Sequence, residues 1–430
     1  MRKLLIISIL AASAAVVGKA QVNYRDYPNP EFARMIDENP AIACLNACPY
    51  ELAVQPGADT KAPRGYRPVY ISHYGRHGTR SGWDQDKYEL IIKTLNQAKE
   101  AGILTASGDS LLQETELVKE ATGKMDGRLT IRGQREHRAI AGRTYERFPR
   151  VFRRGSRNIR VLTSEVPRCI ISMNSFTNSL MRQNPRLQIR LDTGEKFMRY
   201  LDNTEGWQRI TAAAGPKTRA YIGAMPDDTL GILPRVFRDP QAARKYVRST
   251  RRFTDDVWST AIIAEDFDIE DDLFRFLPFD ALYRRWAQSN IGLYTGHCNS
   301  VEAGAERVPL ARTAVEDIVA KADEVIASGQ WAADLRFGHD FPLMALASYL
   351  GIEGVGERYS VEEVCDNWLG FWNIPMASNL QLIFYRNKAG HVLVKFLYQE
   401  QERRLRGLEP VEGPYYDWET VKANLEGYKR

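Results

Sequence analysis

The chain has 430 residues, of which 44% are hydrophobic, and its formal net charge is +5. This length and hydrophobic content are enough for one large core or two moderate ones. Arg2, Lys3 and Lys19 lie in a segment that we expect to be removed, which leaves a net charge of only +2 on the mature chain. So small a positive charge gives little support for a nucleic-acid partner, and we predict no such partner.

The first 20 residues, MRKLLIISILAASAAVVGKA, have the pattern of a secretory signal peptide. Two basic residues precede an apolar run, and small residues lead to a cleavage site after Ala20. The run is too short for a membrane anchor, and no cysteine follows it that could carry a lipid. We therefore expect a periplasmic or secreted protein with no membrane anchor.

Short runs rich in β-branched and aromatic residues predict the strands. They are residues 68–73, 159–163, 334–338, 380–387 and 391–399. Helices are expected between or after the first three runs, which predicts an α/β fold with a mostly parallel sheet flanked by helices. The last two runs are separated by Lys388, Ala389 and Gly390, and we expect them to form a hairpin at one edge of the sheet.

Three helices are predicted around these strands, over residues 131–148, 165–182 and 341–350. Thr130 and Ser164 are expected to cap the first two, and Gly351 can end the third.

Residues 196–300 interrupt the alternation of strands and helices, since they have helical periodicity and few strand patterns. We expect them to form an inserted all-helical cap domain, with residues 84–126 as a second, smaller excursion. After the signal peptide of residues 1–20, the α/β domain would comprise residues 21–195 and 301–430.

Polar side chains follow the first three predicted strands, at the edge where open α/β sheets bind ligands. They are Arg76, His77, Arg80, Arg168, His339 and Asp340. Guanidinium groups match phosphate oxygens bidentately, and the neighbouring glycines would let the backbone approach closely. These residues predict a pocket for a phosphoryl group.

Phosphoryl transfer needs a nucleophile, positive charge and a proton for the leaving oxygen. His77 is the candidate nucleophile, because the adjacent arginines disfavour its protonated form. Asp340 is the only acid at these junctions and is the candidate proton donor. It also stands where a helix N-cap is expected, which would explain it without catalysis.

The motifs RHGTR ending at Arg80, TSEVPR ending at Arg168 and GHD ending at Asp340 resemble those of the histidine acid phosphatases. These form the second branch of the histidine phosphatase superfamily. Residues 127–149 are similar to the family's LT-x-x-G helix, and their ending, RFP, resembles the multiple inositol polyphosphate phosphatases. The resemblance spans residues 67–399 apart from the predicted cap.

The resemblance implies hydrolysis of phosphomonoesters through a phosphohistidine on His77, with no metal and no other cofactor. Asp340 would act as the acid and then as the base for water. The phosphate-binding residues that it implies are Arg76, Arg80, Arg168 and His339. The expected partner is a small phosphomonoester, first of all an inositol polyphosphate such as phytate.

Two departures from the family's pattern bear on the substrate and the loop. Gly82 stands where the family usually has proline, so we expect a less rigid loop. His339 and Asp340 stand where inositol polyphosphate phosphatases typically have His-Ala-Glu. A sugar-phosphate phosphatase, similar to a glucose-1-phosphatase, or a broad acid phosphatase is therefore the alternative. A non-catalytic binder of phosphorylated ligands is a second one, which would need the arginines but no acid.

The other histidines have less specific interpretations. His73 is expected to be structural, and His137 and His391 are each expected to be a surface or supporting residue, while His297 stays open. Arg168 could also be a surface residue in the first turn of its helix.

The five cysteines are Cys44, Cys48, Cys169, Cys298 and Cys365, an odd number for an exported protein. Cys44 and Cys48 could form a local disulfide or be two buried thiols. No metal site is predicted, because no second Cys or His pair has ligand spacing.

Charge is uneven in the predicted cap. Residues 196–252 contain twelve Lys or Arg and five acids, whereas residues 253–290 contain three and nine. Either the basic part forms a wall that faces a polyanionic substrate, or the basic and acidic helices pair with each other.

Overall fold

The computed structural model describes residues 22–27, 29–83, 86–210, 215–225, 230–269 and 272–427. The predicted signal peptide, residues 1–20, lies outside the described residues. Within the described ranges, no helix combines the length and the apolar character needed to cross a bilayer.

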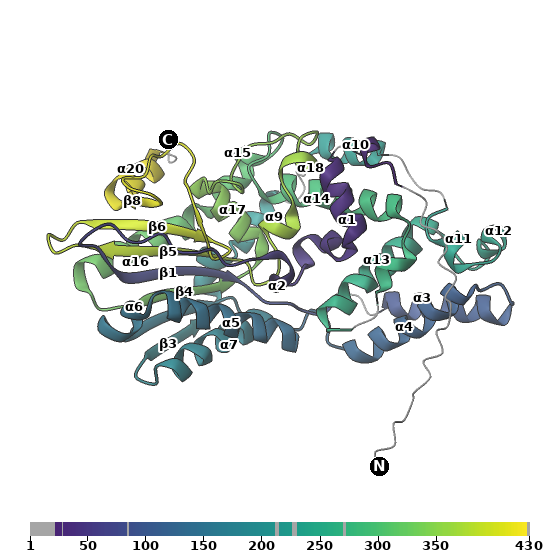
Figure 1. The fold of residues 1–430 in the computed structure, drawn as a ribbon, viewed down its shortest axis with the longest axis horizontal. Helices are drawn as coiled ribbons and strands as arrows, with labels where there is room; N and C mark the ends of the chain where they lie inside the picture. The colour runs from purple at the N-terminus through teal and green to yellow at the C-terminus, as the bar shows by residue number, and fades with distance from the viewer. Residues whose placement is uncertain are drawn as a thin grey trace, which may run out of the picture.

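One mixed sheet has the strand order β3-β2-β4-β1-β5-β6-β7, with β8 also paired to β6 (Figure 1). The strands are β1 Arg67–Arg76, β2 Asn158–Thr163, β3 Gln188–Thr193, β4 Ala333–Gly338, β5 Asn379–Arg386, β6 Val392–Tyr398, β7 Gln401–Arg403 and β8 Tyr415–Asp417. The neighbours β3, β2, β4 and β1 run parallel, and the remaining pairs are antiparallel. The predicted α/β fold class, with a largely parallel core sheet flanked by helices, is confirmed.

Two details of the sheet differ from prediction. The hairpin of β5 and β6 forms, but it does not end the sheet, because β5 pairs with β1 while β7 and β8 pair with the far side of β6. Strand β3 was not predicted. Its sequence, QIRLDT, is almost wholly exposed, so this edge strand lacks the apolar run that marks the others.

Helices cover both faces of the sheet. On one face lie α5 (Ile131–Arg147) and α7 (Pro167–Gln183), and on the other α16 (Arg312–Ser328) and α17 (Asp340–Leu350) (Figure 1). Side chains of β1 alternate between the two faces: Ile71 joins the apolar cluster under α5 and α7, and Tyr70 joins the cluster under α16 and α17. The central strands are therefore buried on both sides.

The ends of these helices explain which predicted caps form. The Thr130 hydroxyl accepts a hydrogen bond from the Gly133 amide at 3.2 Å, and Gly351 ends α17 with φ 68°, as predicted. Ser164 does not cap α7: the helix begins at Pro167, with Val166 as its N-cap. Proline fits the first helical position, because it has no amide hydrogen to satisfy there.

Most of the described residues between 195 and 297 are helical. The helices are α8 Glu195–Leu201, α9 Thr204–Ile210, α10 Pro216–Ala224, α11 Leu233–Val236, α12 Pro240–Ala243, α13 Thr250–Asp266, the 3-10 helix η4 Leu273–Phe276 and α14 Phe279–His297. Two helices of the smaller excursion, α3 (Asp86–Glu100) and α4 (Ala106–Thr122), lie beside α13, away from the sheet (Figure 1). The division into domains remains a prediction.

The remaining short elements surround this frame. They are η1 Tyr24–Asp26, α1 Pro30–Glu38, η2 Pro40–Ala47, α2 Tyr50–Ala53, α6 Pro149–Arg154, α15 Gly304–Arg307, η5 Val308–Ala311, α18 Val364–Asn367, α19 Gly370–Asn373 and α20 Trp418–Gly427. Of these, η2 contributes Asn46, whose side chain donates to Asp340.

Candidate active site

Three adjacent parallel strands, β2, β4 and β1, bring the predicted site residues to one edge of the sheet. The His77 amide, just beyond β1, donates to the carbonyl of Gly338 at the end of β4 at 3.0 Å. The rings of His77 and His339 have centroids 5.4 Å apart. Arg168, in the first turn of α7, places Nη2 2.5 Å from Nε2 of His339. The structure therefore brings these junctions together.

His77 is oriented by its own loop. The ring is buried, and Nδ1 lies 2.9 Å from the carbonyl oxygen of Gly78. A carbonyl only accepts, so Nδ1 carries the hydrogen and Nε2 keeps its lone pair. The pKa of His77 lies well below its usual value. Burial is the largest cause, followed by the charges of Arg76, His339 and Arg168. His77 is thus a neutral imidazole with Nε2 available.

The loop after His77 is fixed by a buried carboxylate on α5. Glu136 accepts hydrogen bonds from the amide and the hydroxyl of Thr79, at 2.8 and 2.7 Å, and from the amide of Tyr50 at 2.8 Å. Burial raises the pKa of Glu136 to about 7 in spite of these bonds. On the other side, Ser172 of α7 accepts from the Gly78 amide at 3.0 Å.

The glycines of this loop serve packing inside the protein. A β-carbon on Gly78 would lie 2.5 Å from the carbonyl oxygen of Gly133 in α5, so the loop and the helix touch backbone to backbone. A β-carbon on Gly75 would lie 2.7 Å from Nε2 of His73. These contacts with α5 and His73 require glycine whether or not a ligand is bound, and the close approach of a phosphoryl group to this backbone stays a prediction.

Arg76 and Asp340 form a buried ion pair, with Nη2 2.8 Å from Oδ2. Nη1 of Arg76 also donates to the carbonyls of Ile374 and Pro375, at 2.9 and 3.0 Å, and the Asn46 side chain donates to Oδ2 of Asp340 at 2.7 Å. Burial would raise the pKa of Asp340, but Arg76, His339 and the Asn46 hydrogen bond lower it to about 2. Asp340 is the first residue of α17 and not its N-cap, which is His339.

His339 is held from its other side by Asp202, whose Oδ1 lies 2.8 Å from Nδ1. Burial opposes a charge on the ring, but Cys169 and Asp202 outweigh it and raise the pKa of His339 to about 10. A protonated His339 cannot accept a hydrogen bond from Arg168, so two donors face each other at this 2.5 Å contact. An oxyanion bound beside the pair would accept from both.

Trp83 lies between two of the arginines. The guanidinium carbons of Arg80 and Arg168 are each 4.8 Å from the centroid of its ring. The indole rests on Gly127, where a β-carbon would lie 2.4 Å from the ring.

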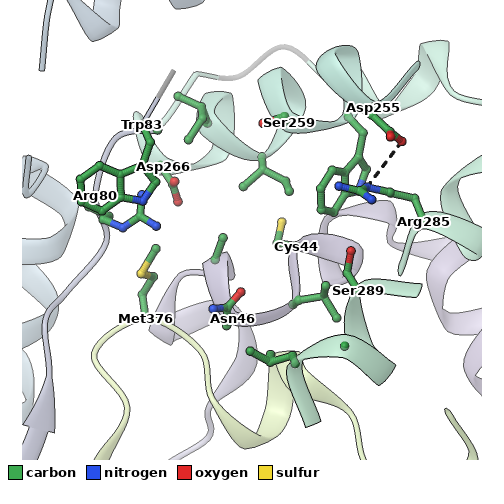
Figure 2. Close-up of a pocket in the computed structure, with 18 of the residues that line it drawn as sticks. Cys44, Asn46, Arg80, Trp83, Asp255, Ser259, Asp266, Arg285, Ser289 and Met376 are labelled. Atoms are coloured by element: carbon green, nitrogen blue, oxygen red, sulfur yellow. Dashed lines mark ion pairs between the residues drawn. The ribbon is translucent and has the colours of Figure 1, made fainter. Parts of the chain in front are cut away.

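A pocket of about 640 Å³ adjoins this cluster (Figure 2). Its walls come from η2, the loop of Arg80 to Trp83, α13 and α14, and Phe341 after Asp340. Gly82 faces this wall: a β-carbon there would lie 3.2 Å from Ile263 and 3.3 Å from Nζ of Lys87. A β-carbon on Gly82 would therefore crowd the side chains of Ile263 on α13 and Lys87 on α3.

The basic segment of residues 196–252 contributes no described residue to the pocket, whereas the acidic segment contributes Asp255, Asp256 and Asp266. For this pocket, the alternative prediction that residues 196–252 form a basic wall is wrong. Arg252 and Asp256 approach within 3.8 Å, and Arg285 and Asp255 within 3.5 Å, so charges of the two signs are interspersed on these helices.

The other histidines are now located. His73 packs against Phe176 and Phe337 and is structural, as predicted. His137 is fully buried against Phe337 and is not a surface residue. His297 lines the pocket and stacks on Phe341 at 4.0 Å. His391 is half-exposed and pairs with Asp417 at 2.8 Å.

All five cysteines are buried free thiols, so the alternative of a Cys44–Cys48 disulfide is not realised. No group of three His, Cys, Asp or Glu side chains suited to a metal ion occurs among the described residues.

Four supporting residues were not predicted: Asn46, Glu136, Ser172 and Asp202. Only Ser172 had a readable signal, because it lies one helical turn after Arg168 and shares its face. The other three reach the site from elements whose packing the sequence does not reveal.

Comparisons with known proteins identify the fold. No family model matches the chain, and no curated protein sequence does. The multiple inositol polyphosphate phosphatase of Bifidobacterium longum, solved in complex with inositol hexasulfate, aligns with 89% of this chain and 97% of its own at a TM-score of 0.73 and 19% identity. Its apo form gives a TM-score of 0.74 at 18% identity, over 89% of this chain and 97% of that chain.

A phytase from D. castellii aligns with 94% of this chain and 89% of its own at a TM-score of 0.66 and 14% identity. Identities this low establish architecture and not activity. The chain therefore has the fold of these inositol polyphosphate phosphatase and phytase structures.

Proposed function

We propose that this protein is an exported phosphomonoesterase of the histidine acid phosphatase family, which works through a phosphohistidine on His77. The observation that carries the proposal is a set of buried, unsatisfied donors. The Nε atoms of Arg76, Arg80 and Arg168 are buried and have no hydrogen-bond partner among the described residues. Three such guanidinium groups beside a neutral histidine suit a phosphoryl group.

In the first step, Nε2 of His77 attacks phosphorus, and the bond from phosphorus to the ester oxygen breaks. Arg76, Arg80, Arg168 and His339 would stabilise the charge on the equatorial oxygens. The proton on Nδ1 stays on the hydrogen bond to Gly78, so the ring needs no base to become nucleophilic.

In this proposal Asp340 donates a proton to the leaving oxygen. Without substrate, the ion pair with Arg76 helps to lower the pKa of Asp340 to about 2. A phosphoryl dianion bound to Arg76 would share that guanidinium and repel the carboxylate, and both effects raise the pKa of Asp340. Asp340 then accepts a proton from water as water attacks phosphorus. The Nε2–P bond breaks, and inorganic phosphate leaves.

Inositol polyphosphates are the first candidate substrates, because structures with this fold include a multiple inositol polyphosphate phosphatase bound to inositol hexasulfate. Sugar phosphates are the second, favoured by the three pocket acids Asp255, Asp256 and Asp266. The signal-like first 20 residues support export.

Phosphate release from p-nitrophenyl phosphate by the purified protein and its His77→Ala variant tests the proposal. We expect turnover by the wild type and a loss of at least about 10⁴-fold in the variant, with unchanged far-UV circular dichroism. Turnover by the variant near the wild-type level would contradict the proposed nucleophile. Tight phosphate binding without any release by the wild type would instead favour a binding protein.

A further inference from the structure

The pocket adjoins the loop that carries His77, although His77 itself does not line it, and it is placed to hold the part of a substrate that is not transferred. Arg80 lines it and belongs to the same loop as His77, Asn46 lines it and donates to Asp340, and Phe341 follows Asp340 directly. A phosphoryl group between the arginines would therefore have its ester carbon directed toward this pocket. At about 640 Å³ the pocket has room for a six-membered polyol ring.

Asp266, the last residue of α13, is the unusual side chain in this pocket. It is 1% exposed, it lines the pocket, and neither carboxyl oxygen has a hydrogen-bond partner among the described residues. Figure 2 shows its carboxyl group beside Arg80 and Trp83. A buried carboxyl without hydrogen bonds is costly, and a carboxylate at a helix C-terminus is disfavoured further. The positive charge of Arg80 attracts a carboxylate at this position, but it leaves both carboxyl oxygens of Asp266 without a hydrogen bond.

The charge of the pocket wall is mixed. Its described lining includes three basic side chains, Arg80, Lys87 and Arg285, and three acidic ones, Asp255, Asp256 and Asp266. Two of the basic groups are engaged by the protein: Nζ of Lys87 donates to Ser259 at 2.6 Å, and Arg285 lies 3.5 Å from Asp255. A ring with a phosphate on every carbon would bring several dianions against this wall. A ring with free hydroxyl groups would bring donors and acceptors instead.

We infer that this pocket selects a phosphorylated polyol with a free hydroxyl group near the scissile phosphate, and that Asp266 hydrogen-bonds that hydroxyl. Inositol monophosphate and glucose 1-phosphate have the required chemistry, and inositol hexakisphosphate does not. The inference rests on the proposed function, because it assigns the substrate class of the same site. Among the candidates named there, it favours sugar phosphates and partly phosphorylated inositols over inositol hexakisphosphate. Asp266 binds a hydroxyl in either protonation state, since a carboxylate accepts and a carboxylic acid can also donate.

The experiment compares kcat/KM for three substrates at matched ionic strength. Inositol monophosphate carries hydroxyls, inositol hexakisphosphate carries none, and p-nitrophenyl phosphate reports the chemical step without a polyol. For the wild type we expect kcat/KM for inositol monophosphate to exceed that for inositol hexakisphosphate by about 10-fold or more, as the loss of a hydrogen bond to a buried polar group implies. A wild-type preference for inositol hexakisphosphate would overturn the inference, and this comparison needs no variant.

Variants then assign the preference to Asp266. In Asp266→Leu, the ratio of kcat/KM for inositol monophosphate to that for p-nitrophenyl phosphate should fall about 10-fold, mainly through KM. Asp266→Asn retains a hydrogen-bonding group and should recover most of the ratio. The matched control is Glu265→Leu, because Glu265 precedes Asp266 on α13 but does not line the pocket. The ratio of the two kcat/KM values in this control should equal that of the wild type.

An unchanged ratio in Asp266→Leu, or an equal fall in the Glu265→Leu control, would overturn the role of Asp266. Failure of the proposed function would look different, because the wild type would then release no phosphate even from p-nitrophenyl phosphate.

Discussion

Gly78 and Gly133 meet backbone to backbone, since a β-carbon on Gly78 would lie 2.5 Å from the Gly133 carbonyl oxygen and one on Gly133 would lie 2.3 Å from the carbonyl oxygen of Thr79. The RHGTR loop and the first turn of α5 are therefore one packed unit. The Thr130 amide donates to the Thr79 carbonyl at 2.9 Å and fastens the same junction. The position of His77 thus depends on a helix about 55 residues later in the chain, since a loop has no ladder of its own to fix it.

Gly78→Ala should displace this loop, because the backbone oxygen that the new methyl group meets cannot move aside. We expect a loss of stability of about 1–3 kcal/mol and a fall in kcat of about 10-fold or more. Gly142→Ala is the control, because Gly142 lies on α5, the helix that Gly78 packs against. A β-carbon on Gly142 would meet only Gln183, at 3.8 Å, so this variant should be neutral or slightly stabilising. Urea unfolding and p-nitrophenyl phosphate kinetics measure both. Equal behaviour of the two variants would show that the contact does not position the loop.

Asp340→Asn should affect substrates according to their leaving groups. An alkyl alcohol needs a proton as it leaves, whereas p-nitrophenolate does not, so the loss in kcat/KM should be about 10²- to 10⁴-fold for an alkyl phosphate and much smaller for p-nitrophenyl phosphate. The ratio of the two rates is the readout. An equal loss for both substrates would mean that Asp340 holds Arg76 in place and does not donate the proton.

The pH dependence should reflect the neutral state of His77. Its pKa is lowered by burial and by the surrounding positive charges, so the ring loses its proton at a lower pH than an ordinary histidine and remains a nucleophile in acid. We expect kcat/KM for p-nitrophenyl phosphate, corrected for ionisation of the substrate, to hold as the pH falls below the ordinary histidine pKa of about 6.5. An acid limb centred near the ordinary value would contradict this.

Glu136 should stabilise the loop that follows His77. Glu136→Ala leaves the buried amides of Thr79 and Tyr50 without an acceptor, which costs about 1–3 kcal/mol for each. Glu136→Gln keeps one acceptor oxygen and should lose less. Chemical denaturation of both variants tests this, and similar stability of Glu136→Ala and the wild type would contradict it.

Much of the sheet could be predicted, because its central strands are buried on both faces and read as apolar runs. The three junctions that carry His77, Arg168 and Asp340 were predicted to converge, and the strand order β2-β4-β1 makes them neighbours. Strand β3 escaped prediction because an exposed edge strand needs no apolar run.

The supporting contacts could not be predicted, because they depend on tertiary packing. Asn46 reaches Asp340 from η2, nearly 300 positions earlier, and Asp202 reaches His339 from the end of α8. The role of Gly82 was equally hidden, since the crowding partner, Ile263, lies on a distant helix.

The central claim is a covalent phosphohistidine, and trapping that intermediate tests it most directly. The Asp340→Asn variant is mixed with p-nitrophenyl phosphate, whose leaving group needs no acid, and the reaction is quenched in base before peptide mass spectrometry. We predict a phosphoryl group on His77, which accumulates because the variant lacks the base that activates water. Turnover with no phosphoryl group on His77, or with one on another residue, would contradict the account.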